Sequence, residues 1–330
     1  DSFEFIQEQI ESSVNNLRDL VIERLFGTAS AYYSIIRVFP IGLIEGGLDP
    51  ESSFDRDSFN SYISCFSFEE AYRLVYLQDL NYLIDSFVET HEQAISSLRT
   101  AFFLLADVNP IGCKSSGAYI VSSPDSHGMM REVESFVIRL YSSLDILSRL
   151  LCELQNVPDT FESFRKIPSD KKALYSAYRR KSLYADDRDL IFCDFSEVAY
   201  LEDLRNEIVH NRAFESAAKC YVRLEEGVIK ERFFLLPDSD ISGRVAKWKG
   251  RSRFYSQEKK GNRYLPQLYL EISARTVRTL RRAVRDLSDE IEKRRADGRL
   301  QEIDSRIKER TPSLVLSAIQ SIAEMAQDGK

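Results

Sequence analysis

The apolar residues of this chain recur every three or four positions over long stretches, and this spacing constrains its fold more than any other feature. The same period occurs in residues 5–21, 73–105, 197–214 and 277–295, and a short last helix is expected over 313–326. The stripe is most regular in residues 132–154, where it comprises Phe136, Leu140, Leu144, Leu147, Leu151 and Leu154. Such stripes are typical of amphipathic helices that bury one side. The sequence therefore predicts an all-α fold.

A short region of the C-terminal half has a different pattern. Residues 219–225 and 232–236 resemble strands, and Glu226-Gly227 between them is a plausible hairpin turn. Residues 267–272 alternate polar and apolar side chains and are expected to form a third strand, with Ser273 capping the helix that follows. We therefore predict a small β insertion, over about residues 217–272, within the helical bundle.

Residues 108–128 are rich in Pro, Gly and Ser, which favours a linker or a long loop. A chain of 330 residues also suggests about two domains. The expected organisation is a helical N-terminal domain over 1–110, a linker over 111–128, a helical domain over 129–300 that contains the β insertion, and a helical tail over 301–330.

Charge is distributed unevenly along the chain. Residues 1–110 hold 18 acidic and 6 basic residues, a net of −12, and residues 111–330 hold 34 acidic and 39 basic residues, a net of +5. One interpretation is that the C-terminal part binds a polyanion. The other is that two domains have complementary surfaces. Under the first interpretation, the acidic part could sense a trigger, recruit a protein partner or shield the basic part.

Two segments concentrate the positive charge, residues 164–184 and residues 244–263. The second contains the only tryptophan of the chain, and exposed aromatic rings beside cations can stack on unpaired bases while the cations neutralise phosphates. The alternative is a solvated loop that binds nothing. The residues predicted to contact RNA are Arg244, Lys247, Trp248, Lys249, Arg251, Arg253, Lys259 and Lys260.

Several classes of protein are not expected. The five cysteines are scattered and form no Cys-x-x-Cys pair, and the three histidines are too few for a His-rich metal site. No apolar run approaches the roughly 18 residues of a membrane span, and the acidic first ten residues do not resemble a secretory signal. We expect a cytoplasmic protein with reduced thiols, no metal, no cofactor and no membrane partner.

The most informative stretch is LRNEIVHNRAF, residues 204–214, which places Arg205, Asn206 and His210 on an apolar helix. A histidine can move the proton of a ribose 2′-hydroxyl, and a guanidinium can stabilise charge on a phosphate. Asn206 and His210 are i,i+4 neighbours, whereas Arg205 lies about 140° around the helix from His210. Either the arginine side chain curls round or a second copy of the helix completes the site.

The segment LRNEIVHN resembles the signature of the HEPN (higher eukaryotes and prokaryotes nucleotide-binding) superfamily, in which Arg is followed by four to six residues and then His. The helix that contains YSSLDILSRLL, residues 141–151, resembles an earlier core helix of that family, with Asp145 as a supporting residue. The resemblance implies a HEPN-like bundle over about residues 128–295 and a metal-independent endoribonuclease of the anti-phage, abortive-infection or toxin type. It also implies a homodimer with a composite site, and the catalytic residues Arg205, Asn206 and His210. Some toxin members carry a Tyr two residues after the His, where this chain has Arg212.

Other interpretations remain open for these residues. His210 could interact with the free carbonyls at a helix end, and Arg205 could pair structurally with Glu202, Asp203 or Asp145. Asp145 itself is expected to be a buried polar partner. His91, on an acidic helical surface, and His127, in the linker, are expected to be incidental. For the whole chain, the alternatives are a non-catalytic scaffold that binds RNA or nucleotide, and a structural helical protein.

Overall fold

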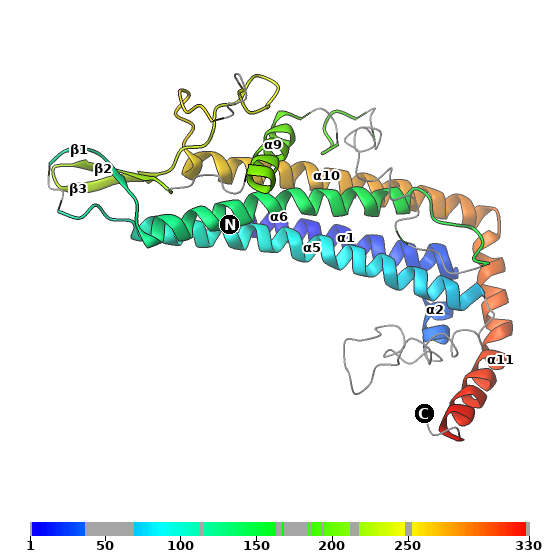
Figure 1. Cartoon of the computed structure of the whole chain (residues 1–330). Helices are drawn as coiled ribbons and strands as arrows, with labels where there is room; N and C mark the ends of the chain where they lie inside the picture. The colour runs from blue at the N-terminus through cyan, green and yellow to red at the C-terminus, as the bar shows by residue number, and fades with distance from the viewer. Residues whose placement is uncertain are drawn as a thin grey trace. The chain divides into compact units, whose positions relative to one another are not determined.

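The computed structural model describes residues 2–36, 69–112, 115–162, 167, 184, 187–192, 195–211, 218–247 and 253–327. In these residues the chain is mainly helical with one small antiparallel sheet, as expected (Figure 1). The elements are α1 (Ser2–Phe26), α2 (Ala29–Ile36), α5 (Glu69–Asp107), β1 (Gly117–Val121), α6 (Pro124–Leu154), α9 (Ser196–Asn211), β2 (Cys220–Glu225), β3 (Val228–Phe233), α10 (Gly261–Ala296) and α11 (Arg299–Gln327).

The long helices lie where the apolar stripes predict them, but α10 differs at its start. It begins at Gly261, so residues 267–272 are helical and the prediction of a strand there is wrong. Leu265, Leu268 and Ile272 are buried, and their spacing is that of a helix. The pattern of residues 267–272 misled the prediction because six residues are too few to distinguish the period of a strand from that of a helix. Ser273 is buried inside the helix and does not cap it.

The sheet has the order β1-β2-β3, with both pairs antiparallel. The hairpin turn at Glu226-Gly227 is confirmed, but the second strand is β3 at Val228–Phe233, so the expected strand over 232–236 is misplaced. Both turn residues have positive φ values of 52° and 77°, as a two-residue turn between twisted strands requires. The third strand is β1, which comes from the segment expected to be a linker. A five-residue strand bounded by Gly, Ser and Pro has too weak a signal to separate from a loop by composition.

The structure divides into two compact units that interleave along the chain. Unit 1 comprises residues 1–11, 85–148 and 173–279, and unit 2 comprises residues 12–84, 149–172 and 280–330. This division differs from the expected boundary at residues 111–128, because each unit combines N-terminal and C-terminal helical segments. In unit 1, for example, the ring of Phe3 on α1 packs against Tyr269 on α10, with 5.6 Å between ring centroids. In this division, residues 1–110 contribute to both units.

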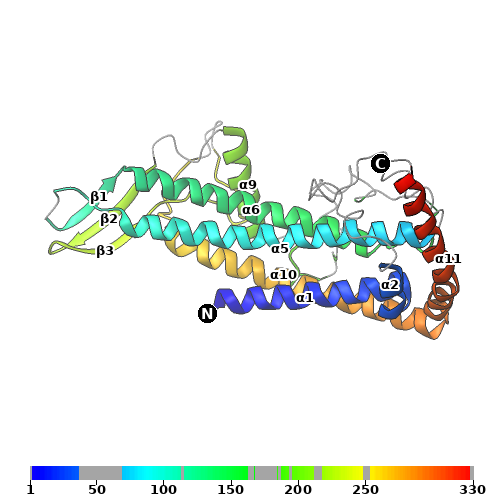
Figure 2. The ribbon, with the colours of Figure 1, turned by 90° about the horizontal axis from the view of Figure 1, so that it is seen from below.

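Within unit 1, α5, α6 and α10 lie side by side and meet at His91 (Figures 1 and 2). The expectation that His91 lies on an acidic surface is wrong, because its side chain is fully buried. Its Nδ1 lies 3.4 Å from Ser143 Oγ on α6, and its Nε2 lies 3.0 Å from Ser273 Oγ on α10. The flanking Glu89 and Glu92 suggest a surface position. A helix turns about 100° per residue, however, so residues one or two positions from His91 lie on other sides of α5 and can be exposed while His91 is buried.

Unit 2 buries two arginines, Arg24 and Arg73, among its apolar side chains. Arg24 Nε donates to Glu290 Oε1 at 2.8 Å, and Arg24 Nη2 donates to Asp159 Oδ1 at 2.7 Å. Arg73 Nη1 donates to the carbonyl oxygen of Leu25 at 2.8 Å. Both arginines thus join segments far apart in sequence, because a buried cation needs partners close by.

Protonation of His91 should destabilise the fold. Burial lowers the pKa of His91 to about 4 from the ordinary 6.5, so the stability that depends on the neutral ring is complete above pH 6.5 and is lost as the pH falls towards 4. Between pH 7.5 and pH 5, the free energy of unfolding of the wild type should fall by about 2 kcal/mol more than that of His91→Gln. Urea unfolding at both pH values measures the difference. His127→Gln, which changes an exposed histidine of α6, should keep the wild-type pH dependence.

Candidate functional site

The residues Arg205, Asn206 and His210 lie on the outer side of α9. Leu201, Leu204 and Ile208 are buried and hold the inner side of the helix against unit 1. Arg205 and Asn206 are half-buried, whereas His210 is exposed in the last turn. The three candidate residues therefore lie on the side of α9 away from its buried apolar stripe, as the sequence predicts.

Arg205 is positioned by an aromatic ring and a neighbouring amide. Its Nη1 donates to Asn206 Oδ1 at 3.1 Å, and its Cζ lies 5.7 Å from the ring centroid of Tyr141 on α6. Among the described residues, Arg205 forms no ion pair with a carboxylate. A cation held by a ring face and an amide keeps its charge for a ligand. The sequence gives no signal for Tyr141, since only the fold brings α6 beside α9.

The acidic residues next to Arg205 on α9 are bound by Arg244. Arg244 Nη1 donates to Glu202 Oε2 at 3.0 Å and to Asp203 Oδ1 at 2.8 Å. The Tyr141 hydroxyl also donates to Glu202 at 3.1 Å, and the backbone N–H of Val245 donates to Asp203 Oδ2 at 3.0 Å. The interpretation that Arg205 pairs with these carboxylates is therefore not what the structure has.

His210 has no hydrogen-bond or ion-pair partner among the described residues, whether Asn206 or a helix carbonyl. Asp145 is half-buried on α6, where its backbone oxygen accepts a hydrogen bond from Ser148 Oγ at 2.8 Å. Asp145 also has a further interaction within the chain, and the partners of Arg205 are Asn206 and Tyr141. The structure thus brings Arg205 and Asn206 together, but it joins neither His210 nor Asp145 to them by a hydrogen bond.

A pocket of about 630 Å³ lies beside α9 and is lined by Asp203, Asp240 and residues 244–247. Helical spacing places Asn206 and His210 on the same side of α9 as Asp203. In the pocket wall, Lys247 lies 3.8 Å from Glu207 Oε1, and its side chain is 58% exposed. This loose pairing leaves a cation near the side of the helix that carries His210.

The other cations predicted to contact RNA have partners within the chain. Lys259 Nζ lies 4.1 Å and 4.6 Å from the ring centroids of Tyr200 and Tyr264, and burial lowers its pKa. Lys260 Nζ donates to Glu231 Oε2 at 2.6 Å. Arg253 is half-buried and also has a partner. Trp248, Lys249, Arg251 and nearly all of residues 164–184 lie outside the described residues.

A cluster on the sheet was not predicted from the sequence. Lys260 and Arg263 each bind Glu231 at 2.6 Å, and Arg223 lies 3.9 Å from it, so three cations surround one carboxylate. The hydrogen bond from Lys260 is the main cause that lowers the pKa of Glu231. On the same sheet the rings of Tyr221 and Phe233 stack with 5.2 Å between centroids. The alternation of side chains along β2 and β3 could have predicted that these residues share a face only if the register between the two strands were known.

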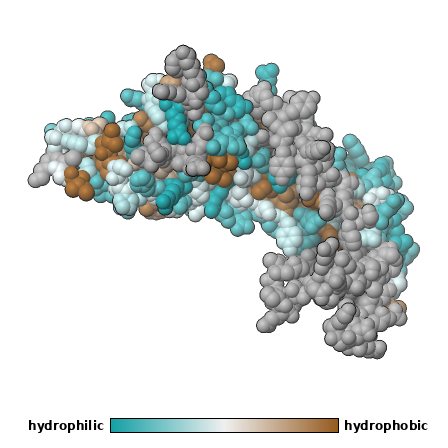
Figure 3. Space-filling view, in the orientation of Figure 1, coloured by the Kyte–Doolittle hydropathy of each residue, from teal (hydrophilic) through white to brown (hydrophobic). Residues whose placement is uncertain are grey.

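Apolar side chains also reach the surface over the sheet (Figure 3), where Ile120 is 63% exposed. Ile120 pairs with Tyr221 across the strands, and Tyr221 pairs with Phe233. These three residues therefore form one row on one face of the sheet. The face thus combines an aromatic row with a local excess of positive charge.

Within the described part of the chain, no group of three or more His, Cys, Asp or Glu side chains is arranged to hold a metal ion. No helix in this part has an apolar stretch long enough to cross a bilayer. In comparisons with protein-family models, curated proteins and solved structures, the chain matches none of them. The functional argument therefore depends on the geometry of the site.

Arg244→Met should loosen residues 240–247 from α9, because it removes both ion pairs of Arg244 while retaining most of the side-chain volume. We expect faster hydrogen exchange at the backbone N–H of Val245, which is bonded to Asp203. Mass spectrometry of exchanged peptides measures this rate. Lys247→Met removes only a 3.8 Å contact and should leave the exchange rate unchanged. Equally fast exchange in both variants would contradict the conclusion that the ion pairs of Arg244 hold this segment against α9.

Proposed function

We propose that the protein is a metal-independent endoribonuclease whose site includes Arg205, Asn206 and His210. One observation carries the proposal. The guanidinium of Arg205 is positioned by Tyr141 and Asn206, while Arg244 and the Tyr141 hydroxyl bind Glu202, the carboxylate three residues before Arg205 on α9. A positioned cation with no carboxylate partner among the described residues, on the same helix as an exposed histidine, suits a phosphodiester.

The chemistry assigned to each residue follows from its side chain. His210 accepts the proton of a ribose 2′-hydroxyl, and the 2′-oxygen then attacks the adjacent phosphorus. The P–O5′ bond breaks, a water molecule gives the departing 5′-oxygen its proton, and His210 releases the proton that it took to solvent. Arg205 stabilises the charge that develops on the phosphate oxygens, and the Asn206 amide orients the phosphate. The products are a 2′,3′-cyclic phosphate and a 5′-hydroxyl.

RNA would approach along the side of α9 that faces the pocket, where Lys247 supplies positive charge. We also assign an RNA-binding role to the sheet face with Tyr221 and Phe233, because stacked rings beside the cations around Glu231 can hold a single strand. Arg244, Lys259 and Lys260 have intrachain partners, so their contribution to RNA affinity should be smaller than their number suggests.

The resemblance to the HEPN superfamily extends this proposal to a cellular role, in anti-phage defence or another stress response. The acidic N-terminal segment would then supply a surface for a trigger or a protein partner. It is not a detachable shield, because removing residues 1–110 would delete α1 and α5 and expose the buried faces of α6 and α10. Surface substitutions are therefore the suitable way to study its role.

His210→Ala should abolish RNA cleavage in EDTA, because it removes the group that transfers the proton. Arg205→Met should lower cleavage by about a hundredfold or more, because it removes a cation that stabilises the transition state. The assay follows a labelled cellular RNA mixture incubated with the purified chain, and mass spectrometry identifies the 2′,3′-cyclic ends. His127→Ala changes another exposed histidine and should retain full activity.

Two results would contradict the enzyme proposal. Cleavage that persists in His210→Ala would remove His210 from the mechanism. Salt-dependent RNA binding without cleavage, equal in the wild type and His210→Ala, would favour the alternative of an RNA- or nucleotide-binding scaffold. That alternative is supported by the observation that no described residue holds the His210 ring.

A composite site in a homodimer makes a separate prediction. If Arg205 of one copy acts with His210 of another, mixing the impaired variants Arg205→Met and His210→Ala should raise cleavage above that of either alone, because some mixed dimers contain one complete site. The measurement is the cleavage rate of the mixture against each variant alone. A mixture as inactive as its components would place all three residues of each site in a single copy.

A further inference from the structure

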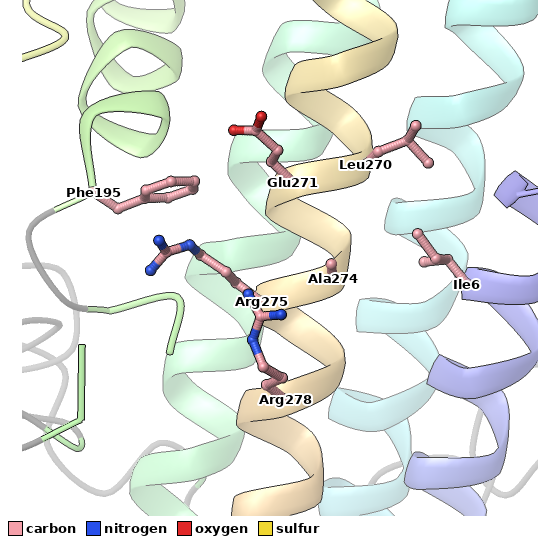
Figure 4. A pocket seen from close by; sticks show the side chains of 7 residues that line it. All are labelled: Ile6, Phe195, Leu270, Glu271, Ala274, Arg275 and Arg278. Carbon is pink, nitrogen blue, oxygen red and sulfur yellow. The ribbon is translucent and has the colours of Figure 1, made fainter. Parts of the chain in front are cut away.

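One face of α10 forms a second pocket, separate from the residues assigned to RNA cleavage. Glu271, Ala274, Arg275 and Arg278 share this face because they are spaced at i, i+3, i+4 and i+7. They line a pocket of about 490 Å³ together with Ile6, Leu270 and Phe195 (Figure 4). All of these residues belong to unit 1.

The two arginines of this pocket are held in place but not neutralised. Arg275 Cζ lies 3.8 Å from the ring centroid of Phe195 (Figure 4), and Arg275 Nη1 donates to the carbonyl oxygen of Arg188 at 2.7 Å. Arg278 Nε donates to the carbonyl oxygen of Asp189 at 3.1 Å. Among the described residues, neither forms an ion pair with a carboxylate. A guanidinium has five N–H donors, so most of them are not used by these bonds.

Glu271 is the carboxylate among the residues that line the pocket. Glu197, in the first turn of α9, is close enough to act on its charge. Burial and the neighbouring charge of Glu197 raise the pKa of Glu271. Arg275, four residues further along α10, acts on this pKa in the opposite direction. The two arginines outnumber the single carboxylate among the residues that line the pocket.

We propose that this pocket binds a phosphate monoester with an apolar body. Two planar guanidiniums fixed on one helix face match the charge and the oxygen geometry of a phosphate dianion. The apolar side chains of Ile6, Leu270 and Ala274 give the rest of the ligand a surface to cover. The backbone carbonyls that hold the arginines keep them oriented before the ligand arrives, which lowers the entropy lost on binding.

The test uses calorimetric titration of the full chain with phenyl phosphate, with inorganic phosphate and phenol as comparisons. Phenyl phosphate should bind more tightly than inorganic phosphate, and phenol should not bind. Arg278→Met should weaken phenyl phosphate binding about tenfold or more, the usual effect of losing a charge-assisted hydrogen bond. Arg285→Met changes an exposed arginine on the same helix outside the pocket and should leave affinity unchanged.

A second variant tests the position of the ligand without changing any charge. Ala274→Phe fills the pocket while keeping both arginines, so it should abolish phenyl phosphate binding and leave the thermal unfolding temperature nearly unchanged. His210→Ala should bind as the wild type does, which separates this site from the proposed nuclease.

Three results would overturn the proposal: no binding of phenyl phosphate to the wild type, binding that Ala274→Phe leaves intact, or equal losses in Arg278→Met and Arg285→Met. Inorganic phosphate binding as tightly as phenyl phosphate would overturn the assignment of an apolar body. If Arg278→Met does not fold, Ala274→Phe and Arg275→Lys decide the question, because Arg275→Lys keeps the charge but loses the planar fork and should weaken binding.

Discussion

Long helices must bury one face along much of their length, and the polar groups on that face must find partners inside. In this protein α5, α6 and α10 contain 39, 31 and 36 residues. His91 meets this requirement in unit 1, because its two ring nitrogens contact the hydroxyls of Ser143 and Ser273. Unmade bonds of this kind would cost more than the contacts themselves contribute. The three helices are therefore joined at this point of unit 1, and the pocket with Arg275 and Arg278 lies on another face of α10.

The electrostatics of α9 depend on a contact between distant parts of the sequence. Arg244 binds Glu202 and Asp203, so residues of the β insertion neutralise the acidic side of the helix. The same ion pairs take Arg244 out of the set of free cations and leave Arg205 without a competing carboxylate. One interaction thus reduces the expected basic surface and supplies the strongest support for a phosphate-binding arginine. The net charge of a segment does not reveal this pairing, because it does not say which charged side chains lie close together in the fold.

The two candidate sites use different chemistry on neighbouring helices. Arg205, Asn206 and His210 combine a cation with a group that can transfer a proton, as cleavage requires. Arg275 and Arg278 combine two cations with apolar side chains and lie beside a carboxyl pair, which suits binding without cleavage. Phe195, which lines the second pocket, directly precedes α9, whereas His210 lies in the last turn of that helix. The sites therefore share no residue, and variants of one can serve as controls for the other.

The helices and the hairpin could be predicted from the sequence alone, because apolar period and turn chemistry are local properties. The placement of Arg205, Asn206 and His210 on one exposed helix follows from the same local rule. The tertiary structure decided the rest: that His91 is buried, that β1 joins the sheet, that residues 267–272 are helical, that Tyr141 lies beside Arg205, and that Arg244 binds Glu202 and Asp203. Each of these depends on a partner far along the chain. A sequence records which groups need partners, but only packing selects the partner from among many residues of the same kind.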